Sequence, residues 1–126
     1  LRIVLDHLAG VRIDGGAPNA AWLEGIRAVG ERENVYMKVS ALVESSDDTP
    51  APDDVAYYAP TLDAIWDAFG ADRVIYGSNW PVSGRYAPYA KVQRIVDEYV
   101  TGKGDEARTK YFRDNSKTAY KWLDRQ

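Results

Sequence analysis

Three apolar segments of this sequence each lead into side chains that can do chemistry. The first runs into Asp6 and His7, the second carries Lys38, and the third ends in Asn79 and Trp80. An imidazole can polarise a carbonyl group, an ammonium group can anchor a substrate, and an amide can orient a water molecule. These groups are candidates for one site, provided that the fold brings the three segment ends together.

The third segment has the clearest pattern, because an apolar run at residues 74–76 stops abruptly at Gly77 and Pro81. A continuous apolar run is typical of a strand covered on both faces. Gly77 permits close backbone approach, and Pro81 cannot extend a strand ladder. Proteins of the α/β class place their chemistry at the C-terminal ends of such strands. We therefore expect Asn79 to lie at the edge of a site.

Strand and helix patterns alternate along the chain in the order β-α-β-α-β-α-α. Apolar runs and period-two alternation predict the strands, and apolar residues at helical spacing predict the helices. The predicted strands cover residues 3–5 and 35–40, and the third lies in the motif of residues 74–82. The predicted helices comprise one from an Asn19 cap to Gly30, one closed by Gly70, one that includes residues 92–99, and one with Asp105 as a possible cap that includes Leu123.

Strands that are separated by helices pair in parallel, so their C-terminal ends share one edge of the sheet. His7, Lys38 and Asn79 are therefore expected to lie close together. Three parallel strands with helices could form a small open sheet, but the pattern looks more like the end of a larger barrel. We interpret residues 1–126 as one partial domain of an α/β fold.

Composition narrows the class of protein. The chain has 126 residues, of which 45% are hydrophobic, and no apolar run approaches the length of about 20 residues that spans a bilayer. A net charge of -3 leaves no basic footprint, so neither nucleic acid nor a membrane is expected as a partner. The chain has no cysteine and no visible signal peptide, so we expect no disulfide, no cysteine-based zinc site and a cytoplasmic location.

The strand-end motifs resemble those of the amidohydrolase-related (amidohydrolase 2) TIM-barrel hydrolases, in particular the branch that contains sugar lactonases. Residues 5–8 look like the sixth-strand DH motif, residues 34–40 like the seventh-strand NVxxKxS motif, and residues 77–81 like the eighth-strand motif. Asn115 and Tyr120 are similar to the signature of the final helix. The resemblance covers nearly the whole chain and implies the C-terminal part of a (β/α)8 TIM barrel, with its last three strands, which are too few to close a barrel of eight.

The resemblance implies attack of water on a lactone, a cyclic ester or an amide, with a small molecule as the substrate. His7 would polarise or position the carbonyl group. The family usually has an aspartate where this chain has Asn79, and that aspartate serves as general base or as metal ligand. An amide has no basic site near neutral pH, so we expect weak or absent turnover. A divalent metal such as zinc takes about three protein ligands and is expected only with the family's first-strand His-x-His pair, which this sequence lacks.

Each remaining candidate also has a structural interpretation. Lys38 either anchors the substrate or forms a structural ion pair, while Asp6, next to His7 in a strand, is expected to face the helix layer. Trp80 either packs at the barrel rim, which the pattern favours, or forms a wall for a sugar ring. Arg12 and Arg85 lie in loops on the same edge and are candidate ligands for a substrate carboxylate.

Two other features of the chain lead to alternatives. The acidic loop from Glu44 to Asp54 is interpreted as a solvated surface or a cover, because its carboxylates lack a ligand spacing. The second hypothesis for the whole chain is an inactive barrel fragment, stable as a homo-oligomer or through association with the rest of a barrel. A third is a compact open sheet that binds a small ligand at its edge.

Overall fold

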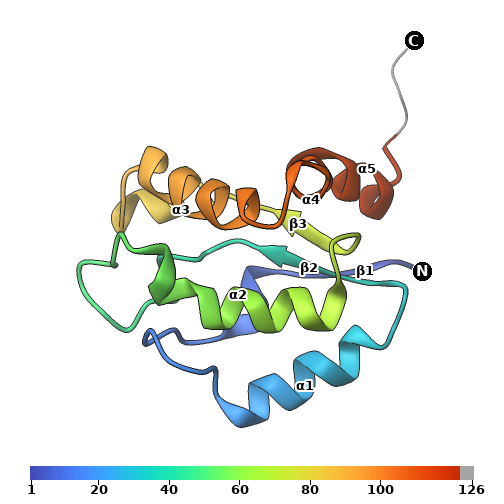
Figure 1. The fold of residues 1–126 in the computed structure, drawn as a ribbon, viewed down its shortest axis with the longest axis horizontal. Helices are drawn as coiled ribbons and strands as arrows, with labels where there is room; N and C mark the ends of the chain where they lie inside the picture. The colour runs from blue at the N-terminus through green and yellow to red at the C-terminus, as the bar shows by residue number, and fades with distance from the viewer. Residues whose placement is uncertain (123–126) are drawn as a thin grey trace.

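Strands and helices alternate in the computed structural model, which describes residues 1–122 (Figure 1). The strands are β1 (Ile3–Leu5), β2 (Val35–Val39) and β3 (Val74–Tyr76). The helices and short helical turns are η1 (His7–Gly10), α1 (Ala20–Gly30), α2 (Val55–Phe69), η2 (Val82–Arg85), α3 (Tyr89–Thr101), α4 (Asp105–Thr109), η3 (Lys110–Asp114) and α5 (Asn115–Tyr120).

The three strands form one parallel sheet in the order β1-β2-β3. Leu5 pairs with Met37, and Met37 pairs with Val74, so the strands run side by side in one direction. The α/β class and the shared C-terminal edge that the sequence predicts are therefore confirmed.

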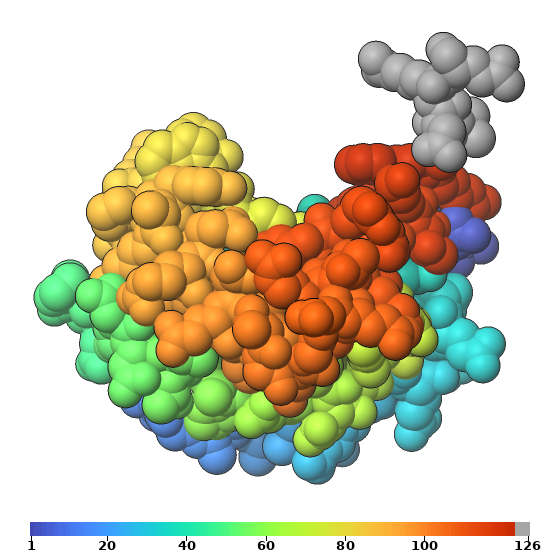
Figure 2. Space-filling model, turned by 45° about the horizontal axis from the view of Figure 1, so that its top comes forward, coloured from blue at the N-terminus to red at the C-terminus, as the bar shows by residue number. Residues whose placement is uncertain are grey.

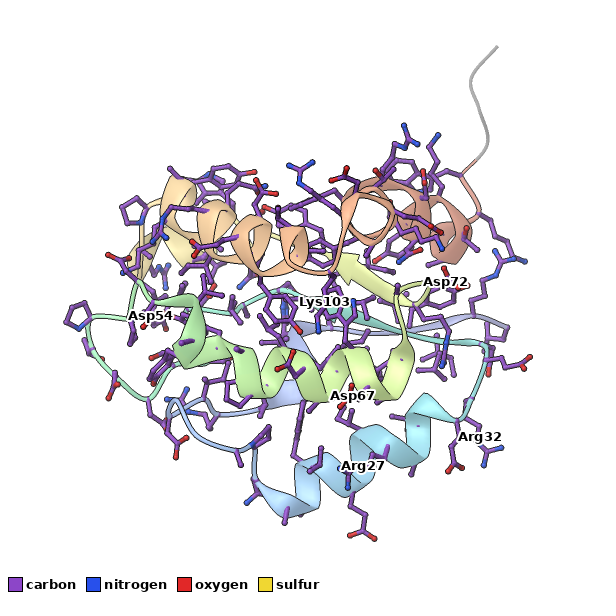
Figure 3. All side chains as sticks on the ribbon, viewed as in Figure 1. Arg27, Arg32, Asp54, Asp67, Asp72 and Lys103 are labelled. Atoms are coloured by element: carbon purple, nitrogen blue, oxygen red, sulfur yellow. The ribbon has the colours of Figure 1, made fainter. Side chains whose placement is uncertain are left out.

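Side-chain caps and a left-handed glycine set the limits of α1 and α2. Asn19 accepts hydrogen bonds from the backbone N–H groups at the start of α1, at 2.9 and 3.2 Å, as its sequence position predicts. Asp54 caps α2 in the same way, at 2.9 Å from the Ala56 nitrogen (Figure 3). Gly70 ends α2 with a φ of 68°, a conformation that favours glycine.

The predicted fourth helix divides into α4, the wider turn η3 and α5. Its N-cap is Gly104 and not Asp105, which is the first residue of α4 and makes no side-chain capping bond. The prediction of that cap is wrong; an acidic residue in the first turn instead complements the helix dipole. The buried Asn115 amide donates to the carbonyl oxygens of Ala71 and Val74, at 2.7 and 2.8 Å, and so fixes α5 against β3. Leu123 lies outside the described residues.

The main core lies on one face of the sheet, and a smaller cluster lies on the other. Helices α1 and α2 lie below the strands in Figure 1, and α3 to α5 lie above them. The small cluster consists of Tyr36, Ile75 and Ala119, with Val4 packed against it. The main core joins residues of β2 and β3 to residues of α1, α2 and α3. Its buried members include Ile26, Met37, Ile65, Val74 and Ile95.

Arg27 on α1 and Asp67 on α2 are exposed charged side chains (Figure 3). Within residues 1–122, no helix is long and apolar enough to cross a bilayer.

Two glycines of α1 provide a matched test of the contact between α1 and α2. A Cβ on Gly30 would lie 2.5 Å from the Ala68 carbonyl oxygen, whereas a Cβ on Gly25 would meet nothing within 4 Å. We expect Gly30→Ala to lower the free energy of unfolding by about 1–3 kcal/mol, and Gly25→Ala to raise it by about 0.5–1 kcal/mol. Urea denaturation measures both, and equal effects would contradict the close packing of α1 on α2.

Candidate active site

His7 lies in the turn after β1 and reaches across to the end of β2. Its Nδ1 lies 2.8 Å from Ser40 Oγ, and its backbone N–H donates to the same oxygen at 3.2 Å. Ser40 is only 2% exposed, so it makes these bonds away from solvent. Because Ser40 Oγ already accepts from the backbone, its own proton is left to donate to Nδ1. This arrangement favours the Nε2–H tautomer of His7.

Each strand is followed by a residue with a left-handed backbone. His7 after β1, Ala41 after β2 and Asn79 after β3 have φ values of 53°, 56° and 54°. Such conformations are uncommon outside glycine and concentrate where a site demands a particular geometry. Their position at all three strand ends indicates that this edge, rather than the opposite one, is the functional edge of the sheet.

Lys38 forms an ion pair with Asp6, with 2.7 Å between Nζ and Oδ1. Burial lowers the pKa of Lys38, but hydrogen bonds to Asp6 and Tyr120 raise it more, so the net shift is upward. The expectation that Asp6 faces the helix layer is wrong. Val4 pairs with Tyr36, so the next residues on the same face are Asp6 and Lys38, and His7 escapes the alternation because its backbone turns there.

Asn79 contacts a carboxylate that the sequence motifs did not single out. Its Nδ2 donates to Glu44 Oε1 at 2.8 Å. The interpretation of Glu44 as solvated surface is wrong, because Glu44 Oε2 is buried and has no hydrogen-bond partner among the described residues. The available signal was the apolar pair just before it: Leu42 and Val43 are each 1% exposed and hold this loop against the core.

A cavity of about 440 Å³ joins these strand ends, a size that suits a small ligand. Figure 2 shows the surface hollowed between the segment around α3 and the C-terminal helices. At the floor, a Cβ on Gly77 would lie 2.8 Å from Ser40 Cβ, which explains the need for glycine there. The lining residues used here are His7, Lys38, Ser40, Gly77 and Asn79 from the strand ends, and Phe112, Ser116 and Tyr120 from η3 and α5.

Three predicted substrate contacts lie outside the lining of this cavity. Trp80 is 51% exposed and packs edge-on against Tyr89, with 5.7 Å between ring centroids. Arg12 binds Asp47 at 2.6 Å and the backbone of the loop after β2, and with Arg85 it lines a second cavity, of about 520 Å³. Roles of these three residues in substrate binding stay predictions.

Within residues 1–122, no group of three or more His, Cys, Asp or Glu side chains is arranged so that it could hold a metal ion. His7 is the sole histidine of the chain. The residues present therefore do not by themselves match a catalytic zinc centre, which takes about three protein ligands.

Comparison with models of known protein families matches the Amidohydrolase model over residues 1–122. The chain belongs to the amidohydrolase family. This confirms the family that the strand-end motifs resemble. The amidohydrolase chain is 33% identical over 132 aligned residues to L-fucono-1,5-lactonase of Burkholderia ambifaria, in a match that covers 99% of this chain and 43% of that protein.

Two solved amidohydrolase structures from Burkholderia multivorans share the fold. One, with bound HEPES, gives a TM-score of 0.84 at 24% identity and covers 97% of this chain and 45% of that one. The other, with bound zinc, gives 0.74 at 27% identity and covers 82% and 38%. This amidohydrolase chain thus spans less than half the length of these relatives, in agreement with the prediction of a partial barrel.

Removal of the Asp6 charge tests the ion pair at the sheet edge. In Asp6→Asn, burial still opposes the charged form of Lys38 while the carboxylate that favours it is gone, so the pKa of Lys38 should fall. NMR titration of the lysine side chains measures this shift, and Asp47→Asn, which changes the partner of Arg12, is the matched control. In the wild type, the raised pKa of Lys38 stabilises the folded state. This stabilisation is complete at pH values below the pKa of Lys38 in the unfolded chain, and it is lost as the pH rises through the pKa of Lys38 in the folded chain. An unchanged Lys38 titration in Asp6→Asn would contradict the pair.

Proposed function

We propose that this chain acts in a hydrolase that opens a sugar lactone by attack of water on the carbonyl carbon. The observation that carries the proposal is the convergence of His7, Lys38 and Asn79 on one cavity at the C-terminal edge of three parallel strands. The similarity to an L-fucono-1,5-lactonase supports a lactone as the substrate class. A lactone of one sugar ring is small enough for the cavity of about 440 Å³.

His7 and Lys38 have complementary roles in the proposed reaction. With Ser40 Oγ donating to Nδ1, the ring carries its proton on Nε2, which is free to donate to the carbonyl oxygen as that oxygen gains negative charge during attack by water. Lys38, already paired with Asp6, stands beside the same cavity and would hold a substrate hydroxyl or carboxylate. Trp80, Arg12 and Arg85 would contact only a substrate that extends beyond the cavity.

Asn79 would orient the attacking water. Its Nδ2 is committed to Glu44, so its Oδ1 is the atom that remains to accept a hydrogen bond from water. An amide oxygen cannot take the proton at neutral pH, and on Asn79 alone we predict impaired turnover.

Zinc, which one neighbouring structure contains, is compatible with this chain only if other residues supply ligands. His7 would be a single ligand. Asn79 and Glu44 are hydrogen-bonded to each other, and they would have to break this contact to bind a metal.

Hydrolysis of L-fucono-1,5-lactone by the purified chain, followed in a pH-stat assay, tests the proposed function. We expect turnover above the uncatalysed rate, and a loss of about 100-fold in His7→Gln, because the group that polarises the carbonyl is weakened. Arg27→Ala, on the outer face of α1, is the control and should match the wild type. Turnover that is absent, or that persists unchanged in His7→Gln, would contradict the proposal.

A second candidate is a barrel fragment that works through association. Within residues 1–122, strands β1 and β3 each pair on one side only, and Leu1 and Ile3, before and at the start of β1, are exposed. Unpaired strand edges of this kind recruit further strands. The partner would be a second copy of this chain or the remainder of a barrel.

Light scattering after size-exclusion chromatography tests this candidate. Association predicts a mass of at least twice 14.1 kDa, with unfolding that depends on protein concentration. A monodisperse monomer that unfolds cooperatively would exclude self-association.

A further inference from the structure

The loop after β2 brings a carboxylate into contact with Asn79, which cannot itself act as a base. Glu44 lies behind Asn79 and lines the second cavity, of about 520 Å³. Glu44 Oε1 accepts from Asn79 Nδ2 at 2.8 Å, across the ends of β2 and β3. A carboxylate only accepts hydrogen bonds, so this contact turns the Asn79 amide in one direction, with Oδ1 away from Glu44. The pair therefore offers one neutral acceptor, Asn79 Oδ1, and one carboxylate that can take a proton.

The second oxygen of Glu44 has an open hydrogen-bond position. Oε2 is buried and unpartnered among residues 1–122. A buried acceptor without a donor is unfavourable, and its ordinary resolution is a donor from a water molecule or a ligand. Arg12 does not fill this role, because its NH1 donates to the Glu44 backbone oxygen at 3.2 Å while its NH2 and Nε hold Asp47.

The loop that carries Glu44 is fixed rather than free. Ser45 Oγ donates to the Ala41 carbonyl oxygen at 2.8 Å, and the Ser45 backbone nitrogen donates to the same atom at 3.1 Å. Leu42 and Val43 are buried in the main core. Glu44 is therefore held beside Asn79 by the fold, as a group that takes part in catalysis must be.

We propose that Glu44 is the general base of this site and that Asn79 is its water-orienting partner. This inference rests on the proposed lactone hydrolysis and names the group that completes it. One water molecule would donate one proton to Asn79 Oδ1 and direct the other at the Glu44 carboxylate.

The proposed step balances as a hydrolysis. Glu44 takes a proton from water while the water oxygen forms a bond to the carbonyl carbon, and His7 stabilises the negative charge on the carbonyl oxygen. The intermediate then collapses, the bond from that carbon to the ring oxygen breaks, and the proton on Glu44 passes to the leaving oxygen. The products are a hydroxy acid and the ionised Glu44.

The same contact explains why an aspartate at position 79 would not simply improve this chain. Asn79→Asp would place two carboxylates on a contact of 2.8 Å, and like charges at such a distance cannot both remain ionised without cost. The exchange variant Glu44→Gln with Asn79→Asp keeps one carboxylate and one amide on the contact, with their positions reversed.

Four proteins test the proposal: the wild-type chain, Glu44→Gln, Asn79→Asp and the double exchange variant, with Glu24→Gln on the surface of α1 as the control. We expect Glu44→Gln to lower kcat for L-fucono-1,5-lactone about 100-fold or more with little change in KM, because the amide keeps the contact but cannot take a proton. The kcat of the exchange variant should be at least about tenfold higher than that of Glu44→Gln. Independently of activity, Asn79→Asp should lower the Tm at pH 8 by about 4 °C or more, and the exchange variant should restore it.

The outcomes separate this proposal from the proposed function. Turnover that depends on His7 but survives Glu44→Gln within threefold would overturn the role of Glu44 and leave lactone hydrolysis intact. If none of the four proteins shows turnover, both the proposed lactone hydrolysis and the role of Glu44 as its general base are contradicted. An Asn79→Asp chain as stable as the wild type, or an exchange variant that folds yet stays as slow as Glu44→Gln, would also overturn the proposal.

Discussion

Parallel pairing of β1, β2 and β3 determines where the polar side chains of this chain lie. All three strands end at one edge, so loops that are more than thirty residues apart in sequence become neighbours. The loop after β2 lies between the other two and bonds to both, through Ser40 to His7 and through Glu44 to Asn79. The candidate site is therefore a row of contacts across strand ends, and each contact depends on the register of the sheet.

The backbone conformation just after each strand also determines where the side chains of the site lie. The left-handed residue after each strand stops the alternation of side chains and turns the chain back over the edge. At His7 this turn brings both the ring and the backbone N–H to Ser40. At Asn79 it places an amide between the cavity and Glu44, in a conformation that asparagine tolerates better than most residues. The strain of these turns is offset by the packed cores on either side of the sheet.

Much of the fold was predictable because it follows from periodicity. Strand positions, the Asn19 cap and the Gly70 helix end all follow from local patterns, and the motifs around His7, Lys38 and Asn79 indicated the family. Contacts made through irregular loops were not predictable in this way. The pairing of Asp6 with Lys38 depends on where β1 stops, and the approach of Glu44 to Asn79 depends on the course of a loop with no repeating pattern.

The tautomer of His7 is the most direct test of the claim that strand pairing organises a reactive edge. The chain has one histidine, so its ring nitrogens give unambiguous signals in long-range proton–nitrogen NMR spectra. At alkaline pH, the account predicts a proton on Nε2 and an unprotonated Nδ1 that accepts from Ser40, with this pattern lost in Ser40→Ala. A proton on Nδ1, or a mixture of tautomers that Ser40→Ala leaves unchanged, would contradict it.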